Sequence, residues 1–163
     1  MTRSINQLSH TLLKGSKIAA FIAALLLTVG ISSSFATPNN DRTDAVTASF
    51  RKDFKKAELL ATESGKNFTK LTFKMNDVVL FAFYSGDGNL LAVVRNIKLS
   101  QLPIQLMLKV KQDYSDYWIS DLFELDADGS TNYYITLENA NSTITLRSAD
   151  TTTWETYSKK TKE

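Results

Sequence analysis

The sequence predicts an α+β domain: an antiparallel sheet of about six strands with two helices packed on one face. Two segments repeat their apolar residues at three- and four-residue steps, which is the period of an α-helix. Six further segments alternate apolar with polar residues or are short apolar runs, as strands do. Short turns rich in Gly, Asn and Asp separate these strands, which favours antiparallel meanders. The predicted order is one helix followed by three strands, occurring twice.

The first helix is expected to begin at Asp44 and to end before Gly65. Thr43 or Asp44 can supply its N-cap. The polar residues 37–43 before it predict a flexible lead-in. Its apolar face is formed by Val46, Phe50, Phe54, Ala57 and Leu60 or Ala61.

The period then changes to two, which indicates strands. Residues 67–75 alternate Leu, Phe and Met with Lys and Thr, so this strand should have one face in solvent. Residues 78–84 are almost wholly apolar, and this strand should be covered on both faces, at least in part. Residues 85–89, Ser-Gly-Asp-Gly-Asn, predict a hairpin loop, and residues 90–97 form the third strand.

The second half repeats this layout after about fifty residues, which suggests a pseudo-duplication within a single domain spanning residues 44–148. Pro103 suits the first turn of the second helix, which Leu102 precedes. Residues 118–126, 131–138 and 142–147 are the predicted strands. Residues 149–163 are polar and rich in Thr, and two alternatives stay open for them: a frayed tail or a weak edge strand.

Residues 1–36 have the order of a secretory signal peptide. Lys14 and Lys17 precede an apolar run over residues 18–31, and small residues lead to an expected cleavage site after Ala36. At 14 residues the run is shorter than the roughly 20 that a membrane-spanning helix needs. An uncleaved anchor is the alternative. The mature protein is therefore expected to be periplasmic or secreted.

The mature chain lacks the side chains that most enzymes use. It has no cysteine, and the single histidine, His10, leaves with the signal. Loss of Arg3, Lys14 and Lys17 also leaves 16 basic against 17 acidic residues. A nearly neutral domain does not attract nucleic acid or an anionic membrane. We therefore expect a noncatalytic protein with no cofactor and no binding to nucleic acid or, after cleavage, to membrane.

Carboxylates provide two weaker hypotheses. Residues 126–132 suggest a calcium loop, but the glycine is at position four instead of six, and a hairpin turn explains the same residues. Paired carboxylates can perform acid–base chemistry without histidine, yet turns and edge strands account for these acids more simply. The sequence predicts no metal site and no catalytic residue. The candidate acids are Asp113, Asp116, Asp121 and Glu124.

Several short motifs, in this order and spacing, carry a resemblance to a known family. They are Phe50-x3-Phe54-x2-Ala57, the hairpin at residues 84–91, Leu102-Pro103 and the aromatic segment at residues 114–119. Together they resemble the PepSY-like, β-lactamase-inhibitor-like proteins exported by Bacteroidetes-type bacteria, over nearly all of residues 44–148. Members often carry a tryptophan shortly after the first helix, where this chain has Ala61-Thr62-Glu63. The resemblance implies a sheet face laid over a partner protein, and it transfers no inhibitory residue.

The polar side of the sheet is the candidate partner-binding surface. If helices cover one face, the polar residues that alternate along the strands share the other, and Tyr and Arg are common anchors in protein recognition. An ordinary solvated sheet face is the alternative, because threonine is favoured there. Tyr134 and Arg147 are the first candidates, and changing both to Ala should leave stability nearly unchanged. The candidate residues are Lys70, Thr72, Lys74, Tyr134, Thr136, Thr145 and Arg147.

The leading hypothesis is a binding module that docks an exported or envelope protein through this face and inhibits or occludes it. Two other classes remain open. One is a structural or stress-related envelope protein without a specific partner. The other is a carrier of a small apolar ligand between the helices and the sheet, suggested by the many Phe and Leu residues.

Overall fold

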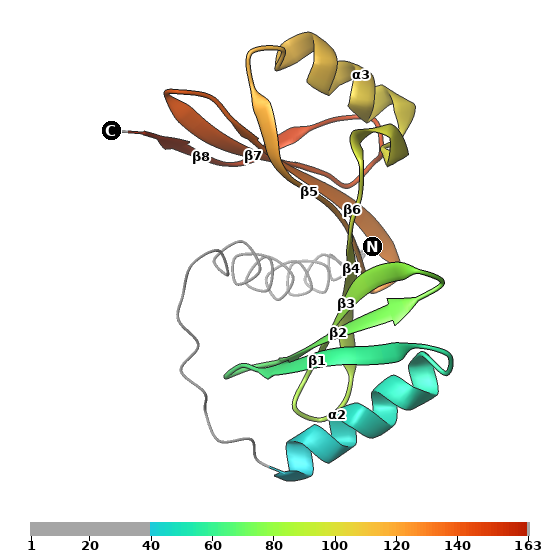
Figure 1. Cartoon of the computed structure of the whole chain (residues 1–163). Coiled ribbons are helices and arrows are strands. Elements are labelled where there is room, and N and C mark those ends of the chain that lie inside the picture. Colours follow the sequence, from blue (N-terminus) through green and yellow to red (C-terminus); the bar gives the residue numbers. More distant parts are fainter. Residues whose placement is uncertain (1–39, 163) are drawn as a thin grey trace, which may run out of the picture. The chain divides into compact units, whose positions relative to one another are not determined.

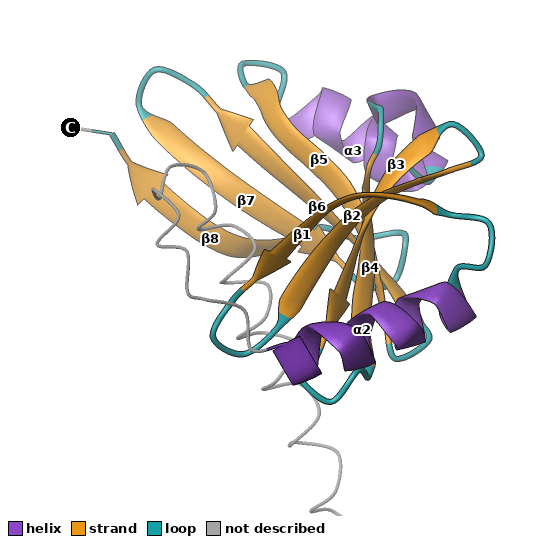
Figure 2. Cartoon of the chain, turned by 60° about the horizontal axis from the view of Figure 1, so that its bottom comes forward, coloured by secondary structure: helices purple, strands orange, loops and turns teal. Residues whose placement is uncertain are grey.

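The computed structural model describes residues 40–162. The predicted signal peptide and residues 37–39 of the predicted lead-in lie outside the described residues. One antiparallel sheet runs through the described part of the chain, with its strands in sequence order (Figures 1 and 2). The elements are α2 (Asn40–Asp53), β1 (Glu58–Ser64), β2 (Thr69–Met75), β3 (Val78–Tyr84), β4 (Leu90–Asn96), the 3₁₀ turn η1 (Leu99–Gln101), α3 (Ile104–Asp113), β5 (Trp118–Ala127), β6 (Ser130–Glu138), β7 (Ser142–Ser148) and β8 (Glu155–Thr161).

The α+β class and the antiparallel sheet are confirmed, but the sheet has eight strands instead of six. The six predicted strands correspond to β2–β7, with bounds that agree within two residues. Strand β1 was not predicted, and β8 is the edge strand that had been left open as one alternative for residues 149–163. Each half of the described chain is therefore a helix followed by four strands, and the predicted unit of a helix and three strands is wrong.

The first helix begins and ends earlier than predicted. It begins at Asn40, so the end of the predicted lead-in is helical, and it ends at Asp53. The chain then turns, with the Phe54 amide bonded to the Phe50 carbonyl and the Ala57 amide to the Phe54 carbonyl. Phe54 and Ala57 still pack on the core beneath α2, so apolar spacing continues past the helix end. Strand β1 was missed because all seven of its residues are exposed, which removes the alternation that marks a strand.

Residues 155–161 form an edge strand, β8, paired with β7. Trp154 precedes it and donates a hydrogen bond from its indole Nε1 to the Leu106 carbonyl of α3, at 3.0 Å. Asp150 accepts hydrogen bonds from the Thr152 and Thr153 amides and holds the preceding turn. Of the two alternatives for the tail, the structure has the strand.

Both helices lie on one face of the sheet, as predicted. Residues paired directly across neighbouring strands point to the same face. Leu71, Ala82 and Val93 are paired in this way, and Val93 pairs with Asp126. Asp126 and Leu122 are four residues apart on β5, so they share a face.

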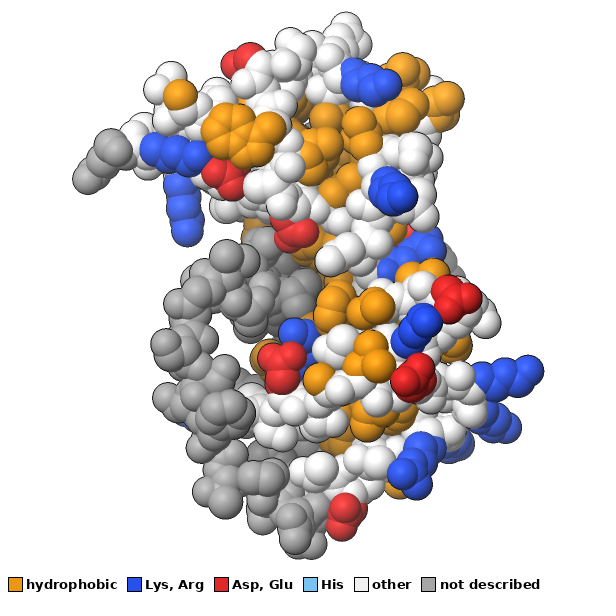
Figure 3. All heavy atoms as spheres, in the orientation of Figure 1, with side chains coloured by type: hydrophobic (Ala, Val, Ile, Leu, Met, Phe, Trp, Pro, Cys, Tyr) orange, Lys and Arg blue, Asp and Glu red, His pale blue; other side chains and the backbone are white. Residues whose placement is uncertain are grey.

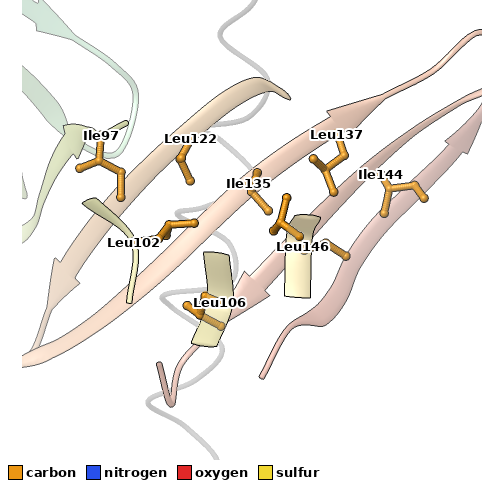
Figure 4. Close-up of a cluster of buried hydrophobic side chains, with 9 residues drawn as sticks. Ile97, Leu102, Leu106, Leu122, Ile135, Leu137, Ile144 and Leu146 are labelled. Carbon is orange, nitrogen blue, oxygen red and sulfur yellow. The ribbon is translucent and has the colours of Figure 1, made fainter. Parts of the chain in front are cut away.

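Two apolar clusters lie beneath the helices on that shared face. Val46 and Phe50 of α2 pack on Leu71 and Phe73, with the Phe50 and Phe73 rings 5.2 Å apart. The cluster beneath α3 is larger and combines η1 and α3 with strands β5–β7 (Figure 4). Its buried members are Ile97, Leu102, Leu106, Val110, Leu122, Ile135, Leu137, Ile144 and Leu146.

Gly88, in the β3–β4 loop, allows α2 to approach the sheet closely. Its φ is +77°, in the left-handed region that favours glycine. A Cβ at this position would lie 2.8 Å from the Ser49 hydroxyl and 3.1 Å from the Ala45 carbonyl oxygen, both on α2. The predicted hairpin therefore also serves as a packing site for the first helix.

Candidate binding surface on the open face of the sheet

The face of the sheet opposite α2 and α3 is called the open face here. Among residues 40–162 no helix covers it, because both described helices pack on the other face. Four sets of residues paired across the strands define it. They are Lys70–Phe83–Ala92, Thr72–Phe81–Val94–Leu125–Asn132, Asn96–Phe123–Tyr134–Arg147 and Asp121–Thr136–Thr145–Ser158.

The centre of the open face is an apolar strip across β3, β4 and β5. Phe83, Val94, Phe123 and Leu125 are at most 3 % exposed. Phe81 lies beside them, paired with Val94. None of these residues was predicted to be part of the surface. The sequence did contain an indication of this strip, because the apolar run at residues 78–84 predicted a strand covered on both faces.

Lys70, Thr72 and Lys74 form one flank of this strip, on β2. The Lys70 amine pairs with Glu63 at 3.0 Å and lies 5.2 Å from the centre of the Phe81 ring. The Lys74 amine pairs with Asp77 at 2.9 Å. Both lysines therefore lie on the predicted face, and each already has an acidic partner.

Tyr134, Thr136, Thr145 and Arg147 form the opposite flank, on β6 and β7. The Thr136 and Thr145 hydroxyls are 3.3 Å apart and hydrogen-bonded. The Arg147 guanidinium donates from Nε and Nη2 to Oδ1 of Asn132, at 3.1 and 2.8 Å. The structure thus places all seven candidate residues on one face but separates them into two groups, with the apolar strip between.

Tyr134 is fully buried, which corrects its assignment as an exposed contact residue. Its ring stacks on Phe123 with centroids 5.1 Å apart, and Tyr157 packs edge-on against it at 5.8 Å. Removing a buried aromatic ring costs about 3–5 kcal/mol. The double alanine variant of Tyr134 and Arg147 would therefore lose stability, contrary to the expectation from sequence.

The Tyr134 hydroxyl is buried and has no hydrogen-bond partner among the described residues. Burial raises the pKa of Tyr134 to about 12, and the Tyr157 side chain adds to this rise, while the charge of Arg147 opposes it. The phenol is therefore neutral at physiological pH and remains a donor.

Of the candidate acids, Glu124 has a structural role, and Asp121 lies on the open face, where it pairs with Thr136. Glu124 is held by Arg95 on β4 through two hydrogen bonds, 3.0 Å from Nε and 3.1 Å from Nη2, on the helix side of the sheet. Asp126 accepts a hydrogen bond from the Thr131 hydroxyl across the β5–β6 hairpin. Within the described range, no group of three or more His, Cys, Asp or Glu side chains is arranged to hold a metal ion.

Apolar and basic side chains also gather on other surfaces. Figure 3 shows hydrophobic side chains over α3, where Ile104 and Leu108 are 64 % and 50 % exposed. It also shows Lys and Arg side chains around the C-terminal end of α2, where Arg51 and Lys52 lie. None of the helices in the described part of the chain is long and apolar enough to cross a membrane.

In the described part of the chain, the class of fold is thus an antiparallel meander with two helices on one face, and several solved structures are similar to it. A DUF2874 family protein from Bacteroides ovatus aligns at 14 % identity and a TM-score of 0.64, over 78 % of this chain and 89 % of its own. A BLIP-like protein from Bacteroides fragilis aligns at 14 % identity and 0.62, over 78 % and 89 %. A Bacteroides eggerthii protein named for a proposed periplasmic location aligns at 13 % and 0.63, over 72 % and 87 %.

These likenesses show the fold alone, because the identities are low. No protein-family model matches the chain, and no curated protein matches it. The expected β-lactamase-inhibitor-like architecture is therefore confirmed at the level of the fold. The PepSY-like part of the resemblance stays an expectation.

Proposed function

We propose that this protein is an exported, noncatalytic binding module that docks a secreted or envelope protein through the open face of its sheet. The mechanism is steric: the sheet covers a surface of the partner and thereby inhibits or occludes it. The observation that carries the proposal is the arrangement of the open face, in which polar and charged residues that solvent reaches, such as Lys70, Thr72 and Arg147, flank a buried apolar strip across β3–β5.

A partner-binding role would explain why the open face carries an apolar strip. Strands that are apolar on both faces are typical of sheets covered on both sides. Here the described helices cover one side only, and the other side bears Phe81, Val94, Phe123 and Leu125. An apolar centre with a polar rim is also the usual anatomy of a protein–protein interface.

Three further observations support an exported, noncatalytic role. The sequence begins with a segment that has the order of a secretory signal. One structure with the same fold is named for a proposed periplasmic location, and another is called BLIP-like. The mature chain lacks histidine and cysteine, which favours binding over catalysis.

The test compares two variants that carry the same chemical change on opposite sides of the sheet. Thr72 lies half-buried on the open face beside Phe81, whereas Thr47, which is also half-buried, belongs to α2 on the other face. Thr72→Arg places a bulky charge on the docking surface, and Thr47→Arg is the matched control. Each is used as bait, after its melting temperature is checked, in cross-linking capture from the native envelope.

We expect wild type and Thr47→Arg to retain the same protein and Thr72→Arg to lose it. Equal recovery by both variants would place the contact elsewhere on the molecule. Enrichment of nothing by any bait would favour a structural envelope protein without a specific partner.

A further inference from the structure

One end of the open face brings together a buried hydroxyl and a guanidinium group with unused donors. We call the group formed by Asn132, Tyr134 and Arg147 the Tyr134–Arg147 corner. Tyr134 on β6 and Arg147 on β7 are direct cross-strand partners. Their side chains therefore leave the sheet on the same face, about 4.5–5.5 Å apart at Cβ.

Arg147 has no acidic partner among the described residues. Its two hydrogen bonds go to the amide oxygen of Asn132, which is neutral. Glu155 is the residue paired with Arg147 on β8, yet no ion pair joins the two. A guanidinium group has five N–H donors, so three of them lack an acceptor in the described part of the chain.

The lysines on the other flank differ in this respect, because both are neutralised by carboxylates. Lys70 pairs with Glu63 and Lys74 with Asp77. Arg147 and Lys160, which pairs with Thr143 on the same face, have no ion pair with a described carboxylate, and Arg147 is the one that lies beside Tyr134.

Tyr134 supplies a second, independent observation. Its hydroxyl is fully buried and has no partner among residues 40–162, although buried hydroxyl groups are nearly always hydrogen-bonded. The ring is fixed by Phe123 and Tyr157, so only the O–H bond can turn toward an acceptor. The Tyr134 hydroxyl and the Arg147 guanidinium group thus lie side by side as hydrogen-bond donors, without a counter-ion among the described residues. Such a pair of donors suits one anionic group.

We propose that the Tyr134–Arg147 corner binds a carboxylate of the docked protein, the side chain of an Asp or Glu that lies next to an apolar residue. The carboxylate accepts hydrogen bonds from Arg147 and from the Tyr134 hydroxyl, which are the charge-assisted bonds that arginine forms best. The apolar neighbour of the acid then lies over the apolar strip, beside Phe123. This inference rests on the proposed function and specifies the chemistry of the partner.

The Tyr157 ring packs edge-on against the Tyr134 ring and therefore lies next to the proposed contact. Tyr157 belongs to β8, which among the described strands is an edge strand and pairs with β7 alone. Arg147 is only partly buried, so a carboxylate can contact its guanidinium group first. Binding is thus expected to change the environment of Tyr157 together with that of Tyr134.

The experiment uses two small probes that differ only in charge, phenylacetate and phenylacetamide. They are titrated at constant ionic strength into ¹⁵N-labelled protein comprising residues 37–163, within the compact unit formed by residues 36–163. We expect phenylacetate to shift the Arg147 Nε–H signal and the Phe123 and Tyr134 amides saturably. Its Kd should be about tenfold lower than that of phenylacetamide, as expected for hydrogen bonds to a charged group.

Four variants assign the effect. Arg147→Gln should abolish the preference for phenylacetate, and Arg147→Lys, which keeps the charge without the planar fork, should retain part of it. Tyr134→Phe keeps the ring and should weaken phenylacetate binding several-fold. Lys74→Gln, on the opposite flank, is the matched control and should bind like wild type.

Equal affinity for the two probes, or an unchanged preference in Arg147→Gln, would overturn the proposal. So would phenylacetate-induced shifts confined to the Lys70–Lys74 flank. These outcomes are separable from failure of the proposed function. If the envelope protein is still captured by Arg147→Gln and lost by Thr72→Arg, the open face docks a partner without a carboxylate at this corner.

Discussion

Tyr84→Phe is expected to loosen the attachment of α2 to the sheet. The Tyr84 ring is fully buried beneath α2, and its hydroxyl donates a hydrogen bond to Oδ2 of Asp53 at 3.0 Å. Asp53 is the last residue of α2, so this bond joins the helix end to β3. The substitution removes one oxygen atom and leaves the packing of the ring unchanged.

The magnitude follows from the surroundings of the two groups. A hydrogen bond to a charged group contributes about 1.5–3 kcal/mol to the free energy of unfolding. Asp53 is exposed, so water can replace the lost donor, and we expect a loss of about 1 kcal/mol. For a domain of this size that corresponds to roughly 3–6 °C in Tm.

A double-mutant cycle separates this bond from the other effects of Asp53. A carboxylate at a helix C-terminus opposes the helix dipole, so Asp53→Ala alone removes an unfavourable interaction as well as the bond. Urea denaturation of wild type, Tyr84→Phe, Asp53→Ala and the double variant gives the coupling free energy, which we expect to be about 1 kcal/mol. Asp53→Ala and Asp53→Asn both remove the negative charge, but Asn keeps an oxygen that can accept the hydrogen bond. With Tyr84 present, Asp53→Asn should therefore lower the free energy of unfolding less than Asp53→Ala.

A coupling free energy below about 0.3 kcal/mol would refute this reasoning, because it is within the usual scatter of additivity. Stability of Tyr84→Phe equal to that of wild type would refute it as well. The bond would then be present in the structure without contributing to the attachment of α2.

Two further predictions concern packing and titration. Gly88→Ala should lower the free energy of unfolding, measured by chemical denaturation, by about 1–3 kcal/mol through backbone strain and the contact with α2. Gly129 also has a positive φ, but nothing lies within 4 Å of a Cβ at this position. Gly129→Ala should therefore lower the free energy of unfolding less than Gly88→Ala. In a spectrophotometric titration at 295 nm, Tyr84 and Tyr134 should ionise well above pH 10, because burial raises the pKa of both, that of Tyr134 to about 12. Since their folded pKa values exceed the unfolded value of 10.0, their stabilising effect is complete below pH 10 and is lost as pH rises toward about 12. A titration in which Tyr84→Phe and Tyr134→Phe each remove an ionisation near pH 10 from folded protein would contradict this.

Sequence periodicity predicted those parts of the fold in which one face is buried and the other is not. Strand β2 alternates buried and half-buried residues, and it was predicted within two residues of its observed start. Strand β1 is exposed along its whole length, so nothing in its sequence marks it as a strand. The apolar spacing of Phe54 and Ala57 continued from helix to turn because both contact the core beneath α2.

The candidate surface was predicted in part, again because buried and exposed residues alternate along its strands. Lys70, Thr72 and Lys74 alternate with core residues, so their common face followed from the sequence. Phe123 and Leu125 were overlooked because an apolar residue in a strand is assigned to the core by default, and sequence does not say on which face the helices lie. The hydrogen bonds of Arg147 to Asn132 and the stacking of Tyr134 on Phe123 join residues of different strands, and only the register specifies them.

By itself, the sequence determined the α+β class, the antiparallel meander, two helices on one face and the lack of histidine and cysteine in residues 37–163. These follow from local periodicity and composition, which need no knowledge of distant contacts. The tertiary structure decided the two edge strands, the apolar strip between two polar flanks and the burial of Tyr134. Each of these depends on which residues of separate strands become neighbours, and that is set by packing and strand register, which local sequence patterns do not encode.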